Sequence, residues 1–134
     1  MSEHVQGSAI LVVEDQALVA LDIEDALERA GLAPILFNSC AKAEGYLSEY
    51  RPDAAVLDIR LPDGECTNVA EKLVDLGVPF VVHTGALIDG VDPVFRLGEF
   101  VPKPADVETI VERVRSMLSL AGPDQYVPGA GSKP

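Results

Sequence analysis

The sequence contains no tryptophan, and aromatic residues make up only 5% of its 134 residues. Positive charge is also scarce, because 10 Lys and Arg residues face 22 Asp and Glu residues and leave a net charge of −12. Without a basic cluster, the chain lacks the electrostatic footprint of a nucleic-acid-binding protein. Its apolar runs are too short to cross a bilayer, and residues 1–8 lack the basic and apolar regions of a secretion signal. We therefore expect neither nucleic acid nor membrane as a partner.

Cysteine is equally sparse, with Cys40 and Cys66 as the only two. Neither has further Cys or His residues at the spacing of a zinc site. A chain of this length buries enough surface for a core without a covalent cross-link. We therefore expect both thiols to be reduced and inert, in a cytoplasmic protein.

What is present is apolar: 48% of the residues are hydrophobic and the mean hydropathy is +0.20. That content is typical of a folded acidic domain and not of a disordered acidic tail. We expect one domain over residues 8–120, after a short extension at residues 1–7. The Pro- and Gly-rich residues 121–134 are expected to form a flexible tail.

Short apolar runs alternate with helical patterns along the chain. The continuous apolar run 9–13 is typical of a strand covered on both faces. Strands are predicted at residues 9–13, 34–37, 53–57, 79–83 and 100–101, and helices at residues 17–30, 39–47, 68–76 and 105–120. This alternation predicts an α/β fold with a doubly wound, five-stranded parallel sheet in the flavodoxin-like order 2-1-3-4-5. Asp89-Gly90 and Asp92-Pro93 interrupt the pattern between residues 87 and 97, so the fourth helix is expected to be short or irregular.

Polar residues follow the predicted strands at their carboxyl ends. Glu14 and Asp15 follow the first strand, Asp58 the third, Thr84 the fourth and Lys103 the fifth. In an open parallel sheet these ends form the ligand-binding edge. Three clustered carboxylates repel one another, and a hard cation such as Mg²⁺ relieves that repulsion. A metal, a nucleophilic carboxylate, a hydroxyl and an ammonium are the groups that phosphoryl transfer needs.

Four segments resemble the receiver domain of two-component response regulators, the CheY-like family. They are residues 10–15, 56–64, 84–85 and 103–104, in this order and each at the end of a predicted strand. Each segment is weakly specific alone, whereas all four together are strongly specific. The resemblance covers roughly residues 8–120.

The resemblance implies a role for each acidic residue. Asp58 is the expected phosphoacceptor, which takes a phosphoryl group from a phosphohistidine. Asp15 is expected to bind Mg²⁺ directly and Glu14 through water, with Asp58 and the backbone carbonyl of Arg60 as further metal ligands.

The resemblance also implies a switch. Thr84 is expected to hydrogen-bond the phosphoryl group and Lys103 to neutralise it, with a cis bond between Lys103 and Pro104. Phe100 stands in the place of the family's switch aromatic, whose ring orientation reports phosphorylation.

The expected protein is a single-domain response regulator, because residues after 120 leave no room for an output domain. A histidine kinase or a histidine phosphotransfer protein is the expected phosphodonor. The domain would act as a signalling switch, a phosphorelay intermediate or a phosphate sink, through contacts with other proteins. Its oligomeric state and its output partner stay open.

Two other functions remain as alternatives. A small Mg²⁺-dependent phosphohydrolase could use Asp58 as its nucleophile, but it would need a substrate pocket and a general acid that the sequence does not reveal. A scaffold that works without phosphorylation is the other alternative, and the complete set of site residues argues against it. We interpret His83 as a packed strand residue and Asp63-Gly64 as a turn.

Overall fold

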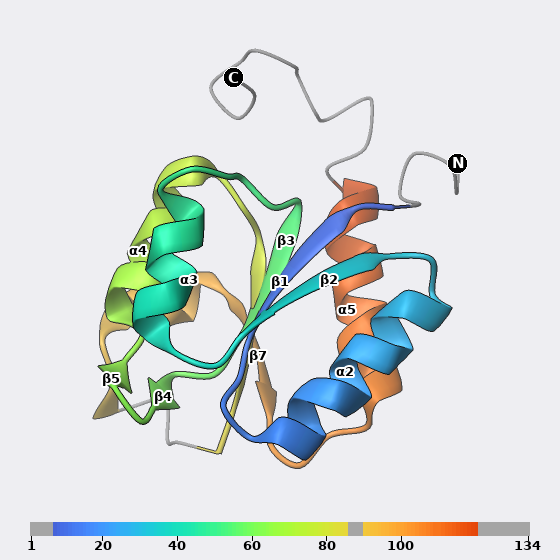
Figure 1. Ribbon diagram of the computed structural model, residues 1–134, viewed down its shortest axis with the longest axis horizontal. Helices are drawn as coiled ribbons and strands as arrows, with labels where there is room; N and C mark the ends of the chain where they lie inside the picture. Colours follow the sequence, from blue (N-terminus) through green and yellow to red (C-terminus); the bar gives the residue numbers. More distant parts are fainter. Residues whose placement is uncertain (1–6, 86–89, 121–134) are drawn as a thin grey trace.

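The computed structural model describes residues 7–85 and 90–120, which form three layers (Figure 1). A five-stranded parallel sheet lies between two helices on one side and two on the other. The sheet strands are β1 (Ala9–Val13), β2 (Ala33–Phe37), β3 (Ala54–Leu57), β6 (Phe80–Thr84) and β7 (Glu99–Pro102). The helices are α2 (Ala17–Arg29) and α5 (Val107–Leu120) on one side, and α3 (Cys40–Leu47) and α4 (Thr67–Leu76) on the other.

The strand order is β2-β1-β3-β6-β7, which confirms the predicted order of the five main strands. Val13 pairs with Phe37 on one side and with Leu57 on the other, and Leu57 in turn pairs with Val82. The carboxyl ends of these strands are therefore level with one another. Residues that directly follow them are brought to one edge of the sheet.

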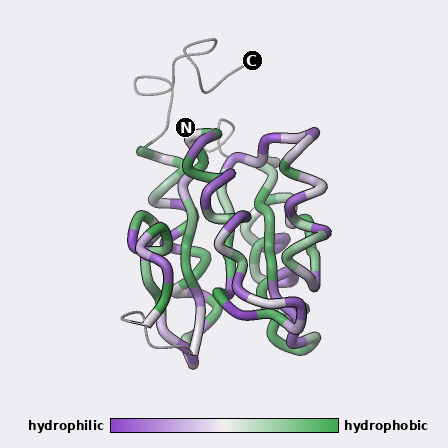
Figure 2. The backbone as a smooth tube through the Cα atoms, turned by 90° about the vertical axis from the view of Figure 1, so that its left-hand side faces the viewer, coloured by the Kyte–Doolittle hydropathy of each residue, from purple (hydrophilic) through white to green (hydrophobic). Residues whose placement is uncertain are grey.

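The apolar strands supply the core on both faces of the sheet. Leu11 and Val13 pack toward α3 and α4, whereas Ile10 and Val12 pack toward α2 and α5. Figure 2 shows the hydrophobic colour running along the strands, with hydrophilic residues spread over the helices and loops. Because both faces are covered, the strands are continuous apolar runs and not alternating ones.

The helix ends follow local sequence signals. The Ser39 hydroxyl accepts a hydrogen bond from the Lys42 amide at 3.2 Å, which confirms the predicted N-cap of α3. Gly77 adopts the left-handed conformation, with φ of 71°, directly after α4. Within residues 7–85 and 90–120, no helix combines the length and the apolar character needed to cross a membrane.

Two short elements complete the described chain. A hairpin of β4 (Arg60–Leu61) and β5 (Gly64–Glu65) was not predicted, because two-residue strands are too short to show a pattern. The 3-10 helix η2 (Pro93–Leu97) confirms the expected short fourth helix, and it buries Phe95 completely. The predicted extension at residues 1–7 and the tail at 121–134 lie outside the described residues, apart from Gly7.

The prediction of two reduced thiols is wrong, because Cys40 and Cys66 form a disulfide. Cys40 begins α3 and Cys66 caps α4, and the fold brings their Cα atoms to 5.2 Å. The length of the chain and the expected compartment indicate only whether the fold needs a disulfide to be stable. They carry no information on which residues become neighbours.

Candidate functional site

Three carboxylates meet at the carboxyl edge of the sheet. Glu14 follows β1 and Asp58 follows β3, and both are buried, with exposed fractions of 4% and 8%. The Glu14 amide donates to the Phe37 carbonyl, and the Asp58 amide donates to the Val13 carbonyl, both at 3.0 Å. These bonds extend the sheet ladders and hold the backbones of both acidic residues in place. Asp15 is exposed, and it completes a group in which one oxygen of each carboxylate lies within 4.8 Å of the others.

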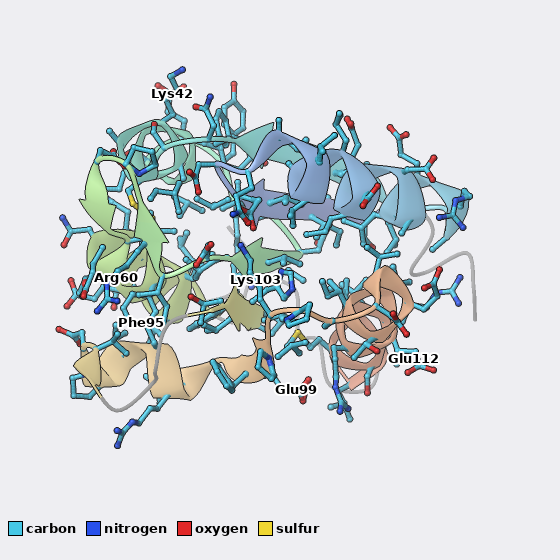
Figure 3. The ribbon with its side chains drawn as sticks, turned by 90° about the horizontal axis from the view of Figure 1, so that it is seen from below. Lys42, Arg60, Phe95, Glu99, Lys103 and Glu112 are labelled. Atoms are coloured by element: carbon cyan, nitrogen blue, oxygen red, sulfur yellow. A yellow bond between two sulfur atoms is a disulfide. The ribbon has the colours of Figure 1, made fainter. Side chains whose placement is uncertain are left out.

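The ammonium of Lys103 enters this group from the end of β7. Its Nζ atom lies 2.8 Å from Asp58 Oδ2, 2.9 Å from Glu14 Oε1 and 2.9 Å from Gln16 Oε1. The three contacts match the three donors of an ammonium group. Sequence reasoning missed Gln16, because a glutamine after two acidic residues carries no signal of its own. Figure 3 looks onto this edge and shows Lys103 near its centre.

Opposing effects act on the Lys103 side chain. Burial on its own lowers the pKa of Lys103, but hydrogen bonds and charge from Asp58 and Glu14 outweigh it and raise the pKa above its usual value. Lys103 therefore stays charged at neutral pH and offsets the repulsion among the carboxylates.

The backbone of Lys103 is also held at the site. Its amide donates to the Thr84 carbonyl at 2.9 Å, and its bond to Pro104 is cis, as predicted. Thr84 is buried at the end of β6. The structure thus places Thr84 and Lys103 beside each other at the edge where Asp58 lies.

Arg60 and Phe100 lie farther out. Arg60 begins β4, and its exposed side chain forms an ion pair with Glu65 at 3.4 Å. In Figure 3 it lies to one side of Lys103. Phe100 pairs with Val82 in the sheet, and 40% of its surface is exposed.

Asp63 does more than form the predicted turn. Its two carboxylate oxygens accept hydrogen bonds from the amides of Cys40 and Ala41, both at 3.0 Å. These hydrogen bonds lower the pKa of Asp63. The hairpin after Asp58 is therefore attached to the N-terminus of α3.

His83 is buried beside the site, which agrees with its interpretation as a packed strand residue. Both ring nitrogens lack a hydrogen-bond partner within the described parts of the chain. The ring borders a cavity of about 350 Å³ whose other lining residues include Gln16, Asp22 and Lys103. Burial lowers the pKa of His83, the charge of Lys103 lowers it further, and Asp58 opposes both effects. The imidazole is therefore neutral at pH 7.

The chemistry of the donors suits a hard divalent cation. Glu14, Asp15 and Asp58 offer carboxylate oxygens close enough to share one ion. Oxygen-only ligand sets of this kind are typical of Mg²⁺ sites. The cluster is therefore consistent with a metal site, next to a buried carboxylate and a fixed cation.

Comparison with known proteins gives a consistent result. The model of the response regulator receiver domain family matches residues 10–115. The transcriptional regulatory protein CseB of Streptomyces coelicolor is 30% identical over 131 residues, which cover 92% of this chain and 56% of CseB. The virulence transcriptional regulatory protein PhoP of Salmonella choleraesuis is 27% identical over 81% of this chain and 51% of its own. The chain thus spans about half the length of these curated relatives.

Solved structures agree with the family match. SdrG from Sphingomonas melonis is 34% identical, with a TM-score of 0.70 over 84% of this chain and 97% of its own. The non-phosphorylated receiver domain of HemR from Leptospira biflexa is 31% identical, with a TM-score of 0.71 over 87% and 98%. The family match, the strand order and the acidic cluster lead to one conclusion: this chain belongs to the response regulator receiver domain family.

Proposed function

We propose that this receiver is a phosphorylation switch, in which Asp58 takes a phosphoryl group from a phosphohistidine of a histidine kinase or a phosphotransfer protein. The observation that carries the proposal is the convergence of three carboxylates with one ammonium at the carboxyl edge of the sheet. Such a group neutralises charge on a phosphoryl group and presents an oxygen nucleophile to it. We place this exchange in the cytoplasm, where ATP-dependent kinases work.

Asp58 acts as the nucleophile in this proposal. One of its carboxylate oxygens forms the new O–P bond while the P–N bond of the donor breaks, and the electron pair returns to the imidazole of the donor. The Asp58 carboxylate is buried and held by Lys103 at 2.8 Å, so its orientation is set before the donor arrives. Such positioning is the main contribution of a protein to phosphoryl transfer.

The acidic residues also form the proposed metal site. Asp15 would bind Mg²⁺ directly and Glu14 through water, and Asp58 and the backbone carbonyl of Arg60 would supply further oxygens. A bound Mg²⁺ neutralises negative charge on the transferred group. Lys103 already bridges Glu14 and Asp58, so it holds the two carboxylates close together.

Thr84, Lys103 and Phe100 respond to the product. The phosphoryl group brings about two negative charges to a pocket that is already acidic. The Thr84 hydroxyl donates to a phosphoryl oxygen, and Lys103 pairs with another. The exposed ring of Phe100 turns as this side of the sheet rearranges, and the altered surface is read by another protein. The change is a shift between two populated states.

Intact mass spectrometry tests the proposal directly. We expect incubation with Mg²⁺ and a small acyl phosphate to add one phosphoryl group to the protein. The Asp58→Asn variant and the wild type without Mg²⁺ are expected to stay unmodified. Labelling of Asp58→Asn would contradict the assignment of the nucleophile.

Two further measurements check the parts of the site. The Asp15→Asn variant is expected to bind Mg²⁺ far more weakly in a titration, and unchanged affinity would place the metal elsewhere.

Phosphate release is expected to be slow and to stop after one turnover per labelling event. Fast catalytic release would favour a phosphohydrolase instead.

A further inference from the structure

The disulfide lies at the end of the loop that carries the phosphoacceptor. This loop runs from Asp58 through the β4–β5 hairpin to Cys66, which caps α4. The disulfide joins Cys66 to Cys40, the first residue of α3. The bond therefore fixes one end of the loop to a neighbouring helix, and Asp58 and Arg60 lie on that loop.

Apolar packing and hydrogen bonds also hold the loop, because Ile59 and Leu61 are buried in the core. The Cys66 amide donates to the Ile59 carbonyl at 2.8 Å, and Asp63 accepts from the amides of Cys40 and Ala41. The hairpin itself consists of two residue pairs. Without the S–S bond, these hydrogen bonds and the packing of Ile59 and Leu61 are left to hold the loop, whose turn at residues 62–65 is exposed. Breaking the bond therefore loosens the exposed turn at residues 62–65, while Ile59 and Leu61 stay packed in the core.

The positions of the two cysteines set the direction of exchange with external thiols. Both cysteines are at helix N-termini, where the helix dipole favours a thiolate. The Asp63 carboxylate is bound at the N-terminus that Cys40 occupies and opposes a thiolate there, so Cys66 is the better leaving group. Both residues are buried, but Cys40 is the less buried of the two, at 5% exposed against 1%, so an external thiolate reaches its sulfur first.

The exchange balances with a small thiol as co-reactant. A first thiolate attacks Cys40 Sγ, forms a mixed disulfide and releases the Cys66 thiolate. A second thiolate then attacks the mixed disulfide, releases Cys40 and leaves as a small disulfide. Two thiols are oxidised, the protein disulfide gains two electrons and two protons, and the reverse reaction uses the small disulfide as oxidant.

We propose that Cys40 and Cys66 form a reversible thiol–disulfide pair, and that the oxidised pair fastens the loop of Asp58 and Arg60 so that the acidic pocket binds Mg²⁺ more tightly. The link to Mg²⁺ rests on the proposed function, which assigns Arg60 and Asp58 to the metal. In a reducing compartment, disulfides are usually transient and redox-sensing, which agrees with a reversible pair and not with a permanent staple. The redox state of the surroundings thereby controls the Mg²⁺ affinity of the receiver.

Thiol trapping tests the reversibility of the pair. The wild-type protein is equilibrated in buffers with graded ratios of reduced to oxidised glutathione, alkylated, and weighed by intact mass spectrometry. We expect a transition from no alkylated cysteine to two within this range. A disulfide that persists in fully reduced glutathione would overturn the proposal, because purely structural disulfides resist that reductant. Two free thiols in fully oxidised glutathione would overturn it equally.

Mg²⁺ titration and hydrogen exchange test the effect on the loop. We expect the oxidised protein to bind Mg²⁺ about tenfold more tightly than the reduced protein. This factor corresponds to the entropy cost of ordering roughly one loop residue, which the disulfide removes from the binding step. Backbone amides of residues 59–66 should exchange more slowly in the oxidised form. Equal Mg²⁺ affinity and equal exchange in both forms would overturn the proposal.

Matched variants separate redox effects from effects of the buffer. Cys40→Ala and Cys66→Ala are expected to show the lower Mg²⁺ affinity in both buffers, with no response to glutathione. A tenfold response that persists in these variants would contradict the role of the pair. Absence of phosphoryl uptake in both redox states would count against the proposed phosphoryl transfer alone, since thiol trapping and Mg²⁺ titration do not measure that transfer.

Discussion

The helices of the two layers of this receiver are held in place in different ways. On the side of α3 and α4, a disulfide joins the two helices, and Asp63 attaches the hairpin to the start of α3. On the side of α2 and α5, the core is built from aliphatic side chains such as Ile23 and Ile110. That side also holds the cavity next to His83. One layer is therefore fastened covalently, whereas the other is held by apolar packing and by the hydrogen bond from Arg115 to the Ala30 carbonyl.

This difference matches the separate roles of Asp58 and Lys103 in the proposed switch. The fastened side carries the loop of Asp58, the group that has to meet the donor in one orientation. The other side borders Lys103, the group that has to move when charge arrives at Asp58. A fixed nucleophile and an adjustable cation are compatible in one small domain, because the loop of Asp58 is tied to α3 whereas Lys103 borders the cavity beside α2.

The largest expected effect is the loss of the covalent link. Reduction of the disulfide should lower the free energy of unfolding by about 3.5 kcal/mol, the loop-closure value for residues 26 apart in sequence. Urea unfolding of the wild type, followed by circular dichroism with and without reductant, measures this difference. The Cys40→Ala variant should show no dependence on reductant. Equal stability of the two wild-type forms would show that the layers are not fastened differently.

The next effect concerns the ammonium between the layers. Lys103→Met leaves Glu14 and Asp58 buried and close together without a cation, and it should cost about 2 kcal/mol at pH 7. Asp58→Asn is the matched variant, because it removes one of the repelling carboxylates and should cost far less. Unfolding of both variants at pH 7 compares them. If Asp58→Asn were the more destabilised of the two, repulsion among the carboxylates would not be the dominant effect.

A smaller effect is expected at Gly98, which packs against Phe80 of the core on the fastened side. A Cβ atom at Gly98 would overlap the Phe80 ring and would lie 2.9 Å from the Phe80 carbonyl oxygen. Gly98→Ala should therefore cost about 1.5 kcal/mol through overpacking. Gly45→Ala, within α3 on the same side, meets no atom within 4 Å and should stabilise the protein slightly. Thermal unfolding compares the stabilities of the two variants. If Gly98→Ala left the stability unchanged, the Phe80 side chain and the nearby backbone would have moved to make room for the added methyl group.

The sequence alone predicts the sheet and most of the site. Continuous apolar strands and level carboxyl ends place Glu14, Asp15, Asp58, Thr84 and Lys103 at one edge without any knowledge of side-chain contacts. These residues could be found because each directly follows a strand, so a correct strand order is enough to bring them together.

The features that were missed depend on contacts between separate segments. The disulfide requires α3 and α4 to start next to each other, and the double hydrogen bond of Asp63 depends on the same proximity. Gln16 reaches Lys103 across 87 residues of sequence. None of these pairs has a local pattern, since each is created by packing and not by periodicity.

The smallest expected effect comes from His83, on the adjustable side. Burial, and then the charge of Lys103, keep its pKa in the folded protein below the value of about 6.5 in the unfolded chain. Between these two pKa values the unfolded state binds more protons, so stability rises with pH. The stabilising contribution is complete above about pH 6.5 and is lost as the pH falls through the lower, folded-state pKa. His83→Leu removes the titrating ring and its two unpaired nitrogens, and should flatten this slope without loss of stability at pH 7. Urea unfolding of both proteins at several pH values between about 5 and 7.5 measures the slopes. Both proteins retain His4, the other histidine of the chain, so the difference between them reports His83. Equal slopes would mean that the imidazole takes up a proton without cost, and that this side of the sheet already accommodates an added charge.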